Sequence, residues 1–302
     1  MASSYRARGA ADQVDGIFIG ISGWRYPPWR GVFYPSGLPQ HCELEYASRK
    51  LPSIEINGTF YSLQRPESFD RWYHDTPPGF IFSVKGARYI THIRRLRDIS
   101  APLSNFFASG IFNLREKLGP ILWQFPPSFR YDPERMRNFF ALLPRDTHQA
   151  LGLARHRDRH MTGRVRLAID ATRPLRHAVE IRHESFIDES FVQLLREHNI
   201  ALVVADTAGK WPYCEDVTAD FLYLRLHGDK ELYASGYTDE ALSRWAEHIR
   251  AWHSGTQPES THRISSTAPS RTERDIYCYF DNDVKVKAPF DAEKLIARLA
   301  AD

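Results

Sequence analysis

The sequence predicts an α/β fold, a single closed (β/α)8 barrel of the TIM type. Eight short apolar runs alternate with segments of helical periodicity, which is typical of a parallel sheet with crossover helices. The runs are almost continuously apolar, as expected for strands that are buried on both faces. None is followed by the glycine-rich GxGxxG turn that would favour an open, doubly wound sheet. The 302 residues fit one barrel, since such domains commonly run to about 250 residues.

The eight predicted strands are spread over the whole chain, and most of them end in a charged or amide side chain. Their ranges are Gly16–Ile21, Ser53–Asn57, Phe80–Lys85, Pro120–Gln124, Ala178–Arg182, Ala201–Asp206, Phe221–His227 and Ile276–Asp281. Helices are predicted at 42–50, 67–74, 102–117, 133–143, 188–198, 239–252 and 290–300. Asp291 is the expected N-cap of the last one.

The repeat is irregular in three places. A long insertion rich in arginine, Arg145–His177, separates the fourth and fifth strands, and we interpret it as a solvated flank. The segment between Asp206 and Phe221 is too short and turn-rich for a full crossover helix. Residues Ser254–Arg274 are rich in Ser, Thr and Pro and predict a disordered loop before the last strand. Residues 1–15 predict a disordered tail, which leaves 16–302 as the barrel domain.

The composition indicates which partners and which cellular compartment to expect. Forty Lys and Arg against 37 Asp and Glu give a net charge of +3, too small to indicate a polyanionic partner by itself. No apolar run approaches the roughly 20 residues of a membrane span, and the first residues lack the apolar stretch of a secretory signal. Three scattered cysteines form no disulfide framework. We therefore expect a cytoplasmic protein that does not associate with a membrane.

The chemistry of a (β/α)8 barrel lies where its strands end, because the carboxyl ends of all eight strands meet at one mouth. Period-two alternation places Glu180 with Arg182 on one face of their strand, and Arg225 with His227 on one face of theirs. Buried charges are costly unless they are paired. A ring of alternating carboxylates and cations can pair internally, so it can be a structural layer or a site prepared for acid–base chemistry or anion binding.

We assign candidate roles by residue type. The catalytic candidates are Glu180, Glu55, Asp281 and His183, with Glu180 as the general acid or base. The remaining polar side chains, and one aromatic wall, are expected to bind substrate: Trp24, Asn57, Lys85, His92, Gln124, Arg182, Asp206, Arg225, His227 and Asn282.

Three mechanisms remain open for an enzyme. Paired carboxylates support hydrolysis or isomerisation, and hydrolysis of a small anionic or polyhydroxylated substrate is favoured. The cations can bind an anion, and Lys85 offers Schiff-base chemistry. Glu180, Asp206, His227 and Asp281 form a conceivable divalent metal site, although no cofactor is required by the sequence.

Two further classes also remain open. The basic insertion and the aromatic residues in loops are compatible with a nucleic-acid-processing barrel of the apurinic-endonuclease type. A ligand-binding protein without catalysis is the other alternative.

Seven sequence blocks resemble the YecE-like proteins, a bacterial and archaeal family whose domain has no known function. They occur in the family's order and cover about residues 17–300: GISGWRYPPWRGVFYP, EINGTFY, FIFSVKGARYITH, ILWQFPPSF, HAVEIRHESF, YLRLHG and YFDND. The resemblance implies a TIM-barrel-like fold and leaves the reaction open.

Overall fold

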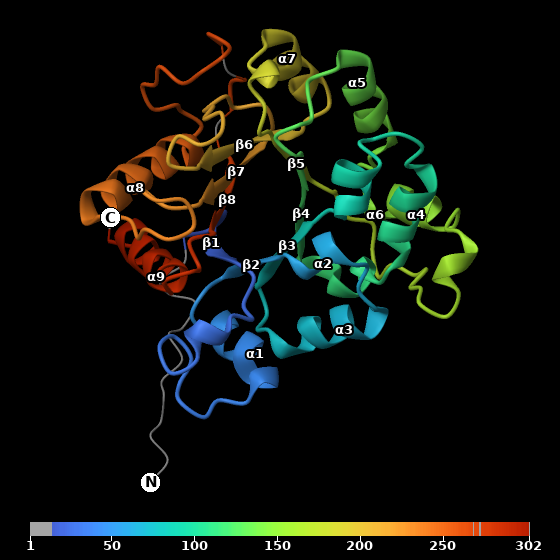
Figure 1. Ribbon diagram of the computed structural model, residues 1–302, viewed down its shortest axis with the longest axis horizontal. Coiled ribbons are helices and arrows are strands. Elements are labelled where there is room, and N and C mark those ends of the chain that lie inside the picture. The colour runs from blue at the N-terminus through green and yellow to red at the C-terminus, as the bar shows by residue number, and fades with distance from the viewer. Residues whose placement is uncertain (1–13, 268, 272, 302) are drawn as a thin grey trace.

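The computed structural model describes residues 14–267, 269–271 and 273–301, and it is a closed barrel of eight parallel strands in sequence order (Figure 1). The predicted fold class is confirmed. The strands are β1 Ile17–Ser22, β2 Ser53–Ile56, β3 Ile81–Lys85, β4 Leu118–Gln124, β5 His177–Glu180, β6 Ala201–Asp206, β7 Phe221–Leu226 and β8 Asp275–Phe280. Each lies within two residues of its predicted range.

Helices cover the outside of the barrel (Figure 1). They are α1 Glu43–Ser48, α2 Gly58–Tyr61, α3 Pro66–Asp75, α4 Ser100–Ala108, α5 Pro133–Leu142, α6 Thr147–Ala154, α7 Glu189–Glu197, α8 Asp239–His253 and α9 Ala288–Leu299. No helix connects β6 to β7, and every residue of that connection is described, so the predicted missing crossover is confirmed.

The long helix predicted over 102–117 is wrong, because the chain turns sharply at Gly110. This residue has a φ of 118°, and a β-carbon built on it would lie 2.5 Å from the Cα of Pro66. Only glycine tolerates both conditions. Helix α4 therefore ends at Ala108, and a 3-10 segment, Ile111–Lys117, leads into β4.

Two other local predictions need correction. Asp291 is not the N-cap of the last helix, because α9 begins at Ala288 and its N-cap is Lys287. The Asp291 carboxylate instead accepts hydrogen bonds from the Tyr237 amide and from Asn282. The basic insertion contains α6, which was not predicted; its first turn is capped by the side chain of Asp146.

Alternate residues along each strand face the barrel interior and the helices. Val203, Ala205 and Tyr223 belong to the small interior cluster, whereas Val204 and Leu224 belong to the larger cluster between strands and helices. The interior also carries paired polar groups: the hydroxyl of Tyr279, for example, is hydrogen-bonded to Ser53 and Ser83 at 2.7 Å each. This alternation decides which polar side chains can meet at the mouth.

The described residues of the Ser254–Arg274 loop contain no helix or strand, and part of the loop is attached to the barrel. The carboxylate of Asp216 accepts hydrogen bonds from the amides of Ile264 and Ser265, and Arg196 donates to Thr267. Residues 1–13 of the predicted tail lie outside the described part of the chain. Within that part, no helix has the length and apolar character needed to traverse a lipid bilayer.

Candidate functional site

Four charged side chains from four strand ends meet at the mouth and form what we call the charge cluster: Glu55, Glu180, Arg225 and Asp281. Arg225 lies at its centre. Its guanidinium donates to Glu55 at 2.9 and 3.1 Å, to Glu180 at 2.7 Å and to Asp281 at 2.8 Å. The strand-end residues of β2, β5 and β7 and the residue after β8 are therefore joined through one cation. This is the convergence that the sequence predicted.

Neutral donors complete the charge cluster. Tyr223 donates to Glu55 at 2.6 Å, and Ser22, which itself accepts from Asn57, donates to the same carboxylate. Gln124 donates to Glu180 at 2.8 Å. Glu55, Glu180 and Arg225 have fully buried side chains, so these hydrogen bonds replace the lost hydration.

The electrostatics keep the cluster ionised. Burial raises the pKa of Glu180, but the charges of Arg182 and Arg225 outweigh it and hold that pKa well below its usual value. Burial opposes ionisation of Asp281 as well, yet Arg225 and His227 lower its pKa to about 2. Glu180 is therefore a carboxylate at neutral pH, which does not support its predicted role as a general acid.

Lys85 differs from its neighbours because its ammonium has no partner. The residue is only 8% exposed, yet no hydrogen bond or ion pair of its Nζ is found within the described part of the chain, whereas its backbone carbonyl accepts from Thr59 at 2.7 Å. Its Nζ lies 4.4 Å from the ring centre of Phe60, a cation–π contact. Burial, with the nearby charge of Arg225, lowers the pKa of Lys85 to about 8.

Arg182 and His92 lie beside Lys85. Arg182 donates from Nε to Glu180 at 2.8 Å, and its guanidinium lies 3.7 Å from the ring centre of Trp211. Burial lowers the pKa of His92 to about 4, and the charges of Lys85 and Arg182 add to this effect. His92 is therefore neutral near pH 7, while two cations face the same space.

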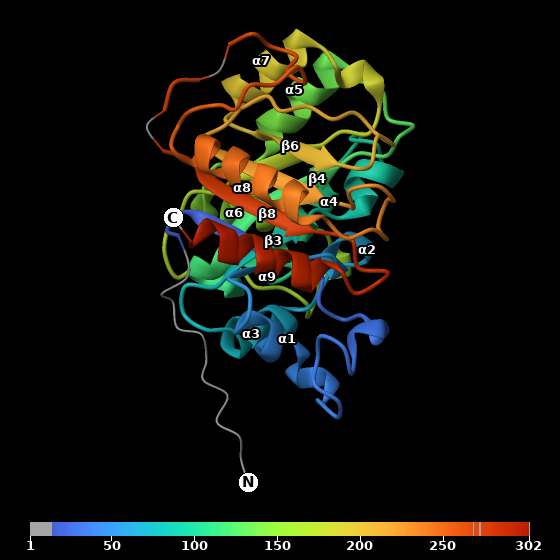
Figure 2. The ribbon, with the colours of Figure 1, turned by 90° about the vertical axis from the view of Figure 1, so that its left-hand side faces the viewer.

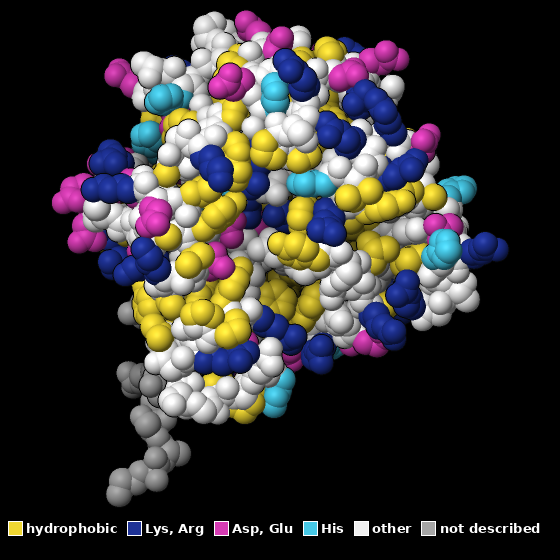
Figure 3. All heavy atoms as spheres, in the orientation of Figure 1, with side chains coloured by type: hydrophobic (Ala, Val, Ile, Leu, Met, Phe, Trp, Pro, Cys, Tyr) yellow, Lys and Arg dark blue, Asp and Glu magenta, His cyan; other side chains and the backbone are white. Residues whose placement is uncertain are grey.

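The carboxyl ends of the strands, and with them the mouth, point toward the viewer in Figure 1. In Figure 2 this end of the barrel is on the right, where the loops that follow β1 and β8 lie. Figure 3 shows Lys or Arg and Asp or Glu side chains recessed near the centre of this face, with hydrophobic side chains around them. Asp281, with a side chain that is 14% exposed, is the one carboxylate of the charge cluster that reaches solvent.

Other predicted residues lie at the edge of the charge cluster. His227 is buried, and its Nδ1 lies 3.1 Å from Asp281 Oδ2. Asn57 contacts the cluster through Ser22. Trp24 is mostly buried and packs edge-to-face on Trp72, with ring centres 5.4 Å apart. It therefore packs the loop after β1 against helix α3 more than it offers a wall to a substrate.

Three predicted site residues do not join the charge cluster, because alternation turns them toward the helices. His183 uses Nδ1 to accept the Ser185 amide at the start of a 3-10 turn. Asn282 is fully buried and donates to Asp291. Asp206 follows the outward parity of Val204 and lines a separate cavity, described below. The predicted substrate contacts of Asn282 and Asp206 at the mouth are therefore not supported.

The metal hypothesis loses its ligand set for the same reason. Asp206 points away from Glu180, His227 and Asp281, and Glu180 is occupied by two arginines and Gln124. Across residues 14–301, omitting 268 and 272, no three His, Cys, Asp or Glu side chains are arranged to hold a metal ion.

Three further residues lie at the mouth and were not predicted from the sequence. Trp211 and Tyr233 come from the loops after β6 and β7; Tyr233 Oη lies 3.4 Å from Arg182. Asp283 follows β8, and burial together with the charge of Asp281 raises its pKa to about 6. Asp283 lies within the YFDND block and so could have been found from the sequence.

The comparisons with known proteins agree with the fold. The family model described as "Protein of unknown function DUF72" matches residues 18–302. The UPF0759 protein YecE of Escherichia coli strain K12 is 26% identical over 262 residues, covering 80% of this chain and 84% of that protein. The UPF0759 protein YunF of Bacillus subtilis is 28% identical over 118 residues, 37% of this chain and 41% of that protein.

Solved structures extend the similarity to the whole barrel. A DUF72 family protein from Thermotoga maritima superposes with a TM-score of 0.68 at 25% identity, covering 92% of this chain and 97% of that one. A DUF72 family protein from Enterococcus faecalis gives a TM-score of 0.62 at 18% identity, covering 95% and 96%. The chain belongs to the DUF72 family of proteins of unknown function, and the resemblance to YecE-like proteins is confirmed.

Proposed function

We propose that this protein is an enzyme that acts on a small anionic substrate at the barrel mouth, with Lys85 and Arg182 binding the anionic group. The observation that carries the proposal is the unpaired ammonium of Lys85. The side chain is only 8% exposed, so its ammonium is incompletely hydrated, and a charge in that position gains stability from a counter-charge. A carboxylate or phosphate bound beside Lys85 would supply the missing counter-charge.

Arg182 supports the same conclusion. Only its Nε is committed to Glu180, and its contact with Tyr233 is long, at 3.4 Å. The face of Trp211 holds the guanidinium in place. An arginine oriented in this way keeps donors for the forked hydrogen bonding that carboxylates and phosphates accept.

The groups that suit proton transfer also lie at the mouth. With a pKa of about 8, Lys85 is mostly protonated at neutral pH and can give up a proton at little cost. Asp283, with a pKa of about 6, titrates close to neutrality. For the hydrolysis that we favour, water would add to the substrate while Asp283 accepts its proton and Lys85 protonates the leaving group.

The test combines binding with turnover. Inorganic phosphate is titrated calorimetrically into the wild type, Lys85→Met and Lys50→Met; Lys50 precedes β2, at the opposite end of the barrel. We expect Lys85→Met alone to lose binding by roughly tenfold or more, about the effect of one charge-assisted contact. Equal binding by all three proteins would contradict the proposal.

Catalysis is tested on a panel of phosphomonoesters and carboxylic esters of small polyhydroxylated compounds. We expect at least one to be hydrolysed by the wild type and not by Lys85→Met. If anions bind and no member of the panel is turned over, the alternative of a ligand-binding protein without catalysis is favoured.

A further inference from the structure

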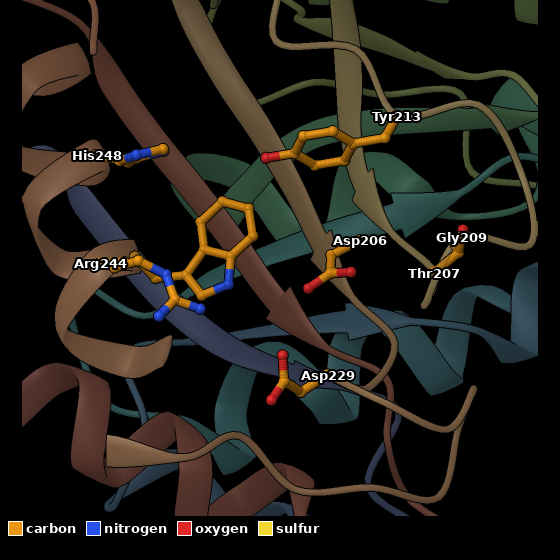
Figure 4. Close-up of a pocket in the computed structure, with 8 residues that line it drawn as sticks. Asp206, Thr207, Gly209, Tyr213, Asp229, Arg244 and His248 are labelled. Carbon is orange, nitrogen blue, oxygen red and sulfur yellow. The ribbon is translucent and has the colours of Figure 1, made fainter. Parts of the chain in front are cut away.

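A second cavity lies outside the mouth, between the loops after β6 and β7 and the helix α8, and we call it the outer pocket (Figure 4). The residues on which its chemistry depends are Asp206, Asp229, Arg244 and Trp245. Its volume is about 350 Å³. Cavities that bind small molecules measure roughly 300–1,000 Å³, so a compact ligand fits.

One side of the outer pocket carries two carboxylates. Asp206 Oδ2 accepts a hydrogen bond from Tyr237 at 2.9 Å, while Oδ1 has only a long contact of 3.4 Å with the Ala208 amide. Asp229 has no hydrogen bond or ion pair to any other described residue. Burial, together with the charge of Asp229, raises the pKa of Asp206. Two carboxylates therefore share this side without a cation.

The other side carries a cation without a carboxylate. Arg244 lies on α8, and neither a hydrogen bond nor an ion pair links its side chain to the rest of the described chain. Trp245 is mostly buried and forms an aromatic wall beside it. Figure 4 shows the Asp206 and Asp229 carboxylates and the Arg244 guanidinium around one space. Because no ion pair within 4.0 Å joins Arg244 to either carboxylate, the two kinds of charge remain separated across the pocket.

Two further polar side chains of the pocket wall, Tyr213 and His248, lie against Glu215. Tyr213 donates to Glu215, and His248 Nδ1 lies 3.6 Å from the same carboxylate. Glu215 is buried behind them. Tyr213 is therefore committed to Glu215, and the charged groups of the wall that lack an ion pair to a described residue are the two aspartates and Arg244.

We propose that the outer pocket is a second binding site that takes a small zwitterion of the amino-acid class. The ammonium of the ligand is bound by Asp206 and Asp229, and its carboxylate by Arg244, with the aliphatic part against Trp245. A zwitterion satisfies both sets of charges at once, whereas a simple anion or a simple amine would leave one set unpaired. The site is independent of the function proposed for the mouth.

The test uses ligands that differ in the distance between their charges. Binding of the ω-amino acids from β-alanine to ε-aminocaproate, and of L-alanine and L-leucine, is measured by saturation-transfer NMR and calorimetry. Butyrate and butylamine supply each charge alone. We expect at least one zwitterion to bind saturably and in competition with the other zwitterions. The two single-charge compounds should bind roughly tenfold or more weakly.

Variants locate the site. Asp229→Asn and Arg244→Gln each remove a side chain that has no partner in the described chain, so both are expected to fold normally. We expect each to weaken zwitterion binding by roughly tenfold or more. Glu247→Gln, an exposed position on the same helix, and Lys85→Met in the mouth should leave it unchanged. Failure of every zwitterion to bind, equal binding of butyrate or butylamine, or insensitivity to both variants would each overturn the proposal.

Discussion

The charge cluster and the outer pocket use the same residue types in opposite ways. In the charge cluster one arginine, Arg225, contacts three carboxylates, and every charge has a partner within 3.1 Å. In the outer pocket two aspartates and Arg244 share a cavity without forming an ion pair. The charges of the charge cluster are paired without a ligand, whereas those of the outer pocket are not.

This difference separates what stabilises the barrel from what is available to bind a ligand. Fully buried and paired charges resist change, because removing one partner strands the others in a medium of low polarity. Unpaired charges at a cavity contribute little to folding and are free to contact a ligand. Lys85 combines features of both regions: it is mostly buried beside the charge cluster, yet its ammonium has no hydrogen bond or ion pair to a described residue.

The largest expected effect comes from breaking the charge cluster at its centre. Arg225→Met leaves Glu55 and Glu180 buried without their shared cation, and we expect it to lower the free energy of unfolding by about 3–5 kcal/mol. Arg244→Gln in the outer pocket should change it by less than about 0.5 kcal/mol. Urea denaturation of the wild type and of the two variants measures both changes in the free energy of unfolding. Similar losses in the two variants would show that the contrast between the regions is wrong.

The second largest effect is expected from acid, which should weaken the charge cluster. The folded pKa values of Glu180 and Asp281 are lowered, so their contribution is complete above the unfolded pKa of about 4 and is lost as the pH falls through the folded value. For Asp281 the contribution to the free energy of unfolding is roughly 2 kcal/mol. Unfolding free energies measured between neutral pH and pH 2 should fall more steeply for the wild type than for Asp281→Asn. Parallel curves for the two proteins would contradict the lowered pKa of Asp281.

Anion binding at the mouth should be weaker in alkaline solution. Lys85 has a pKa of about 8, so its charge is lost as the pH rises through that value, or slightly above it when an anion is bound. We expect phosphate affinity to fall by roughly tenfold for the wild type at alkaline pH, and to stay low and flat for Lys85→Met. A wild-type profile without a step would mean that Lys85 does not contact the anion.

The smallest effect is expected from the basic insertion. Arg155, Arg159 and Arg164 are exposed and lie outside the mouth. Replacing all three by Gln should leave phosphate affinity unchanged and alter stability by at most about 0.5 kcal/mol per site. The same variant examines the nucleic-acid alternative: DNA binding that depends on these arginines and falls steeply with salt would revive it.

The barrel and its charge cluster could be predicted from the sequence because both follow from short-range rules. Apolar runs with polar ends gave all eight strands, and parallel strands bring Glu55, Glu180, Arg225 and Asp281 to one end of the barrel. The period of two was sufficient to show which side chains face inward.

The same rule would have excluded residues that we included. Asp206, Asn282 and His183 alternate with inward-facing neighbours and therefore point to the helices. Their polar side chains suggested a shared site at the mouth, but their positions in the alternation place them on the face of the strand that packs against the helices. The mouth contacts of Trp211 and Tyr233 could not be predicted, because they depend on the path of loops that no periodicity describes. Gly110 ended a helix through a contact with Pro66, 44 residues earlier in the chain, which local propensity does not contain.

The central claim is that Lys85 and Arg182 together hold an anion, and anomalous diffraction from crystals grown with selenate tests it most directly. We expect a selenium peak at the barrel mouth, within hydrogen-bonding reach of Lys85 Nζ and the Arg182 guanidinium, that disappears in Lys85→Met. An empty mouth in crystals that bind selenate elsewhere, or a peak that persists in Lys85→Met, would contradict it.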